Sequence, residues 1–179
     1  MTTTAPAPVG HARGTVGYRR LVGAIWAAGV GSFTLLYAPQ ALLPLISQDL
    51  QVRPSTAALV VSVATGTLAL ALVPMSALAE RVGRTRLMTI ALTAAAVLGL
   101  LAPLAPSIEL LLLARALQGV AIAGLPALAM AHLSEEVRPS AVGVAMGLYV
   151  AGNTVGGLSG RVLASTVARN CSALAGLSV

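Results

Sequence analysis

Long apolar runs separated by short polar segments dominate the pattern along this chain. Five runs carry few ionisable side chains: residues 20–46, 55–78, 86–104, 107–132 and 140–164. Each run exceeds the roughly 18 residues that a helix needs to cross a hydrocarbon layer, at about 1.5 Å of rise per residue. The pattern therefore predicts an all-α integral membrane protein with about five transmembrane helices within residues 20–165.

The two ends of the chain lack this pattern. Residues 1–19 contain Pro6 and Pro8 with several threonines and glycines, which predicts a flexible tail. Residues 166–179, "TVARNCSALAGLSV", lose the apolar pattern and are expected to form an atypical C-terminal tail. A cleaved signal peptide is the alternative for the first run. Its apolar core normally has about 7–15 residues, so the greater length here favours a membrane span.

Composition supports the membrane assignment and argues against a soluble domain or a nucleic-acid-binding protein. Hydrophobic residues make up 57% of the chain and the mean hydropathy is +0.90, against roughly 45–50% apolar residues in soluble domains. The net charge of +6 raises the question of nucleic-acid binding, but aromatic residues are only 3% and the arginines lie at the ends of apolar runs. We therefore expect no nucleic-acid partner. Cys171 is the single cysteine, so no intrachain disulfide or cysteine metal cluster is expected, and no cofactor either.

The distribution of arginines predicts an orientation. If the N-terminus lies inside, the cytoplasmic segments contain Arg13, Arg19, Arg20, Arg81, Arg84, Arg86 and Arg138. The opposite side then contains Arg53, Arg161 and Arg169. Basic residues collect on the cytoplasmic side of short loops. We therefore expect a multi-pass protein of the cell membrane with a cytoplasmic N-terminus.

Charges crowd between the second and third runs, in "ALAERVGRTR" at residues 77–86. Glu80, Arg81, Arg84 and Arg86 lie there around Gly83, which permits a tight turn. A solvated basic loop is the simple interpretation. In the alternative, the carboxylate of Glu80 locks the turn or contacts a neighbouring helix end.

An arginine lies within the fourth run. Arg115 is about 12 Å from the start of the predicted helix, where a charge costs at least about 2.5–3.5 kcal/mol unless it faces a cavity or a partner. Gln118 and Gly119 share its face at i+3 and i+4. This spacing indicates a polar stripe where another helix approaches closely. Snorkelling of Arg115 to the outer interface is the alternative.

The fifth run carries glycines at helical spacing. Gly152, Gly156 and Gly160 recur every four residues beside Gly157, and such a smooth face is typical of close helix packing in membranes. Asn153 lies on the same run and its amide needs a hydrogen-bond partner within the membrane. An interhelical hydrogen bond and a contact with substrate both remain open for it.

Three stretches resemble the major facilitator superfamily. "SALAERVGRTR" is similar to the loop between its second and third helices, with matches at Leu78, Ala79, Arg81, Gly83 and Arg84. "LLLLARALQGV" resembles the pattern in which an intramembrane arginine precedes Gln-Gly. "GNTVGG" is similar to the Gly-Pro-x-x-Gly-Gly element of the drug/proton antiporter branches, with Asn153 in place of the proline.

The resemblance implies a permease built from two six-helix bundles that open alternately to each side of the membrane. It implies that Glu80, Gly83 and Arg84 form a cytoplasmic gate latch and that Arg115 lines the path of substrate or protons. It further implies export of a small organic solute. About five helices are an incomplete N-terminal half, so we expect a truncated product whose missing partners are the C-terminal transporter helices.

Other residues add no catalytic or coupling site. Asp49, Glu109, Glu135 and Glu136 lie near the ends of the predicted helices, so we interpret them as solvated. Serine, histidine and acidic residues do not converge in the sequence, so we do not expect an enzyme. A second hypothesis is a non-transporting remnant or a small membrane protein that acts by helix association through its glycine face.

Overall fold

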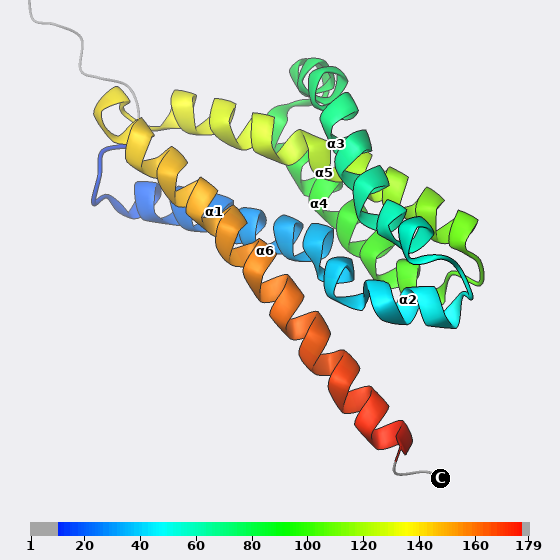
Figure 1. Ribbon diagram of the computed structural model, residues 1–179. Helices are drawn as coiled ribbons and strands as arrows, with labels where there is room; N and C mark the ends of the chain where they lie inside the picture. The colour runs from blue at the N-terminus through cyan, green and yellow to red at the C-terminus, as the bar shows by residue number, and fades with distance from the viewer. Residues whose placement is uncertain (1–10, 177–179) are drawn as a thin grey trace, which may run out of the picture.

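A computed structural model describes residues 11–176, apart from the side chains of residue 127 and residues 171–176. The described chain is helical and contains no strand (Figure 1). Its elements are α1 (Val16–Tyr37), η1 (Ala38–Leu42), α2 (Leu43–Asp49), α3 (Pro54–Val82), α4 (Arg84–Leu101), η2 (Ala102–Leu104), α5 (Ile108–Glu136) and α6 (Pro139–Gly176). Five stretches are long and apolar enough to cross a membrane: Val16–Asp49, Pro54–Val82, Arg84–Leu104, Ile108–Glu136 and Pro139–Asn170. The all-α membrane fold with five spans is therefore confirmed.

Local sequence signals explain where the helices begin. The side chain of Thr15 accepts a hydrogen bond from the Tyr18 amide at 3.3 Å and caps α1, and Ser107 caps α5 in the same way. Pro54 opens α3, at a position where its missing N–H has no intrahelical role. Gly83 separates α3 from α4 with φ of +93°, a conformation that glycine adopts without a steric penalty.

The first span is bent. Proline lacks an N–H group and cannot continue the hydrogen-bond ladder of a helix. Pro39 accordingly lies in the 3₁₀ turn η1, and Pro44 lies in the first turn of the short helix α2. The run predicted as one span at residues 20–46 is therefore a helix, a turn and a second short helix.

Helix α5 packs along α3 and α4, and α6 packs along α1 (Figure 1). Small residues allow this approach, since Ala57 and Ala64 of α3 and Ala95 of α4 are completely buried. Because consecutive spans run in opposite directions, the start of α1, the α3–α4 turn and the α5–α6 loop meet at one end of the bundle. We call it the turn end (residues 11–15, 82–84 and 135–138), and the opposite end the pocket end (residues 38–53 and 102–107).

Within the described residues, the segments predicted as tails are partly helical, because residues 16–19 belong to α1 and residues 166–176 to α6. Residues 166–176 continue α6, because alanine, valine and leucine outnumber helix breakers there and no proline interrupts them. Residues 1–10 lie outside the described part. Residues His11–Thr15, which we call the strap, lie against the α5–α6 loop: the His11 amide donates to Glu136 O at 2.7 Å, and the Arg138 amide donates to His11 O at 3.2 Å.

Candidate functional site

Arg115 of α5 is buried at the meeting point of three helices. Its side chain is only 1% exposed. Nε donates to Val60 O of α3 at 3.1 Å, and the two terminal nitrogens donate to Leu35 O at 3.2 Å and to Leu36 O at 2.6 Å, both in α1. The guanidinium group therefore connects α5 to α3 and α1. Among the described residues, its hydrogen-bond partners are carbonyl oxygens, so carbonyl dipoles stabilise the charge.

The bend of α1 explains why those carbonyls accept from a side chain. In an α-helix Leu35 O would accept from the amide of residue 39, and in a 3₁₀ turn Leu36 O would accept from the same amide. Residue 39 is a proline and has no N–H group. The guanidinium group of Arg115 supplies the missing donors. The proline and the arginine thus form one structural unit, although they are 76 positions apart in the sequence.

Gln118 and Gly119 extend the Arg115 cluster along α5. Gln118 is completely buried, accepts from Arg115, and donates from Nε2 to Ala95 O of α4 at 2.9 Å. A Cβ at Gly119 would collide with Ala64 O and with Oγ1 of Thr67 in α3. The predicted polar stripe of α5 is thus a helix junction, in which Gly119 permits the close approach of α3.

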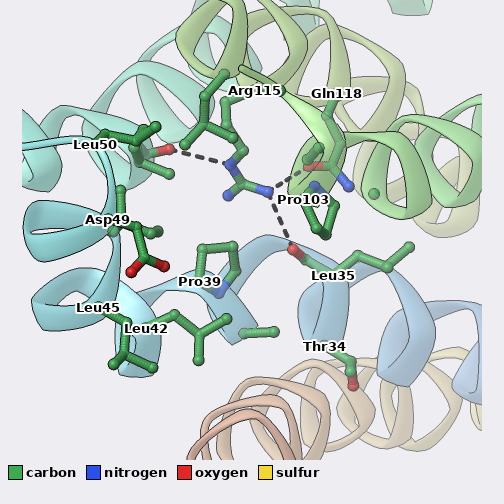
Figure 2. Close-up of a pocket in the computed structure, with 17 residues that line it drawn as sticks. Thr34, Leu35, Pro39, Leu42, Leu45, Asp49, Leu50, Pro103, Arg115 and Gln118 are labelled. Carbon is green, nitrogen blue, oxygen red and sulfur yellow. Dashed lines mark hydrogen bonds between the residues drawn. The ribbon is translucent and has the colours of Figure 1, made fainter. Parts of the chain in front are cut away.

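A cavity of about 520 Å³ lies beside this cluster at the pocket end (Figure 2). Most of its wall is apolar, and it includes Leu35, Pro39, Leu42, Leu45, Ile46, Leu50, Val60, Pro103 and Leu111. Arg115 and Gln118 lie on one wall, and the carboxylate of Asp49 in α2 points toward the cavity from another (Figure 2).

The turn end carries the predicted gate-loop residues. Arg84 forms an ion pair with Glu135, the penultimate residue of α5, and the two side chains are 32% and 59% exposed. Glu80, Arg81 and Arg86 are exposed, and no hydrogen bond or ion pair reaches Glu80 among the described residues. The ion pair at the turn therefore joins Arg84 to Glu135 of α5, whereas the sequence alone predicts a contact of Glu80 and a solvated Glu135.

The glycine face of α6 packs against α1. A Cβ at Gly156 would lie 2.8 Å from Val30 Cα, one at Gly160 would lie 2.7 Å from Thr34 O, and one at Gly152 would lie 2.9 Å from Trp26 O. At Gly157 the nearest neighbour is the ring of Tyr37, at 3.4 Å. All four glycines therefore face one helix of the same chain.

Asn153 is separate from the Arg115 cluster. It is half-buried on α6, and its Oδ1 lies so close to α1 that a Cβ at Gly29 would be 2.6 Å away. Oδ1 is buried without a hydrogen bond to another helix among the described residues. Gly29 precedes Leu35 by more than one turn of α1, so the structure does not bring Asn153 and Arg115 together.

Comparison with known proteins gives a consistent family match. The chain matches the Major Facilitator Superfamily over residues 25–173. It is 42% identical over 151 residues to the uncharacterized MFS-type transporter YybF of Bacillus subtilis, which covers 84% of this chain and 37% of YybF. It is 38% identical over 151 residues to the inner membrane transport protein YnfM of Escherichia coli, which covers 84% of this chain and 36% of YnfM. The chain thus spans little more than a third of the length of these relatives.

A shorter match links the chain to a protein named for efflux. Over 78 residues it is 46% identical to the multidrug efflux pump LfrA of Mycolicibacterium smegmatis, covering 44% of this chain and 16% of LfrA. No solved structure matches.

Proposed function

Because the chain belongs to the major facilitator superfamily, a family of multi-pass membrane transporters, we propose that it forms part of a permease that exports a small organic solute by alternating access. The observation that carries the proposal is the Arg115 cluster, a full charge held deep within a membrane span. Such a charge is costly in a bilayer and marks a path for substrate or ions. The match to LfrA, named as a multidrug efflux pump, favours export.

In this proposal the chain acts with further transporter helices, and coupling of export to protons follows only from the resemblance to drug/proton antiporters. The carboxylates of Glu80, Glu109 and Glu135 lie at helix ends. Arg115 and Gln118 are polar groups buried within α5, and we assign the path of the solute to them. Glu80 is exposed and unpaired at the turn end, and we propose that it latches a gate against those further helices while Arg84 and Glu135 brace the turn.

We propose that the turn end and the N-terminus are cytoplasmic in the cell membrane. Arginines are more numerous at this end, whereas Arg53 belongs to the pocket end. An alkaline phosphatase fused after residue 52, which requires export to fold, is expected to be active. If only a cytoplasmic reporter is active when fused at that position, the proposed orientation is wrong.

The alternative function, helix association through the glycine face, has less support. That face already contacts α1 through Gly152, Gly156 and Gly160. A second copy could reach these glycines only if α1 moved away. The non-transporting remnant remains the alternative that the transport experiment tests.

The transport experiment joins this chain to the C-terminal helices of YybF and measures retention of a fluorescent organic dye in cells. We expect lower retention than with either part alone. Arg115→Ala and Arg115→Lys should abolish export, because lysine keeps the charge but lacks the planar fork that reaches three carbonyls. Arg161→Ala, which removes an arginine stacked 5.2 Å from the Tyr37 ring, is the matched control and should retain export.

Equal amounts of each variant in the membrane, with the same elution volume in detergent, separate lost transport from lost folding. Export by Arg115→Ala at the level of the unmodified chimera would refute the assigned path. Failure of the unmodified chimera, despite normal insertion, would favour the remnant.

A further inference from the structure

The cavity at the pocket end is lined by residues from several helices of this chain. Its wall comes from α1, η1, α2, α3, α4, η2, α5 and the short segment that follows η2. Its volume of about 520 Å³ falls in the range of roughly 300–1,000 Å³ that accommodates small organic ligands. Leucine, proline and alanine side chains provide most of the wall, so the body of an occupant must be apolar.

Two charged residues of opposite sign line the cavity, and they differ in what they can still bind. Arg115 already makes four hydrogen bonds, to three carbonyl oxygens and to Gln118, and is 1% exposed. A guanidinium group has five N–H donors, so little capacity for an anion remains. Asp49 is exposed and has no hydrogen bond or ion pair in the described part of the chain.

The position of Asp49 determines how a ligand would lie. Its carboxylate lines the cavity from α2, and Figure 2 draws it apart from the guanidinium group of Arg115, with no interaction between the two. Leu45, one turn earlier on α2, is 38% exposed and lies at the rim, whereas Leu111 is 8% exposed and forms the inner wall. A cationic group would therefore lie at the rim beside Asp49, and its apolar substituents would fill the cavity.

We propose that the cavity binds an amphiphilic organic cation, with Asp49 as its counter-ion. The unpaired carboxylate of Asp49 at the mouth of the apolar cavity complements the positive charge of such a ligand. The buried charge of Arg115 is offset by three carbonyl dipoles, and it keeps the cationic group of the ligand at the rim. The proposal goes beyond transport, because its test measures binding and does not depend on export.

The test uses two probes of the same shape and opposite charge. Tetraphenylphosphonium and tetraphenylborate are titrated into the purified chain in a non-ionic detergent, and ligand-bound protein is counted by native mass spectrometry. We expect saturable binding of one phosphonium per chain and weaker binding of the borate. Asp49→Asn should weaken phosphonium binding about fivefold, the upper value for a partly exposed ion pair. Glu109→Gln, which removes an exposed carboxylate outside the cavity lining, should leave it unchanged.

A second variant tests the apolar part of the cavity. Leu111→Trp fills it from the inner wall and should abolish saturable phosphonium binding. If that protein does not fold, Leu45→Trp at the exposed rim replaces it, with the same expectation.

Three outcomes would overturn the proposal. Tighter binding of the borate, strengthened by Asp49→Asn, would identify an anion site at Arg115. Unchanged phosphonium affinity in Asp49→Asn and in the tryptophan variant would show that the probe binds only the detergent or the surface. A lower unfolding temperature of Asp49→Asn together with lost binding would show that the carboxylate supports the fold and is no counter-ion.

Discussion

Gly156→Ala should destabilise the contact between α1 and α6, whereas Gly147→Ala should not. Both positions lie in α6. A Cβ at Gly147 meets nothing within 4 Å, but a Cβ at Gly156 lies 2.8 Å from Cα and 2.9 Å from the carbonyl carbon of Val30. These are backbone atoms, so no side-chain rotation relieves the collision. The helices must therefore separate until the distance between the added Cβ and Val30 Cα rises from 2.8 Å to the roughly 3.5 Å of an ordinary carbon contact.

The magnitude follows from comparing the two substitutions. Replacement of glycine by alanine inside a helix is worth roughly 0.5–1 kcal/mol in helix propensity. That gain is common to both positions and cancels in the comparison. The remaining difference is the cost of overpacking, about 1–3 kcal/mol. We expect the upper part of this range, because separation of the helices also weakens the hydrogen bond from Thr34 Oγ1 to Gly156 O, now 3.1 Å long.

Equilibrium unfolding in mixed micelles, followed by tryptophan fluorescence, measures this difference in the free energy of unfolding. Trp26 is the single tryptophan and packs at the same interface, against Gly152. Gly156→Ala should therefore also alter the emission of the folded state, and Gly147→Ala should leave it unchanged. Equal stability of the two variants would refute the inference that the glycine face is held against α1.

Two further predictions concern the turn end. Glu135→Gln should lower the free energy of unfolding by about 0.2–1 kcal/mol, as for other partly exposed ion pairs, whereas Glu136→Gln should have no effect; a loss that persists in an Arg84→Gln background would exclude the ion pair as its source. Gly17→Val should displace the imidazole of the strap, which lies against this glycine, and speed hydrogen exchange of the α5–α6 loop amides. Gly23→Val, where a Cβ meets nothing within 4 Å, is the control, and equal exchange in both variants would argue against a docked strap.

The sequence by itself determined the features that depend on neighbouring residues. Hydrophobic run length fixed the number of spans, and Gly83 and the helix caps fixed where they begin and end. Helical periodicity placed Arg115, Gln118 and Gly119 on one face of α5, and placed the four-residue glycine repeat on one face of α6. These features depend on residues close together in the sequence, so they can be predicted without knowing which helix packs against them.

Only the tertiary structure decided what each of these faces meets. Nothing near Arg115 in the sequence indicates that its partners are the carbonyls freed by Pro39, and nothing near Arg84 indicates Glu135. The position of Asp49 at the cavity depends on the bend at η1, and the strap depends on a loop more than a hundred residues away. Such contacts join segments distant in sequence, where side-chain periodicity carries no information, so they follow from helix packing alone.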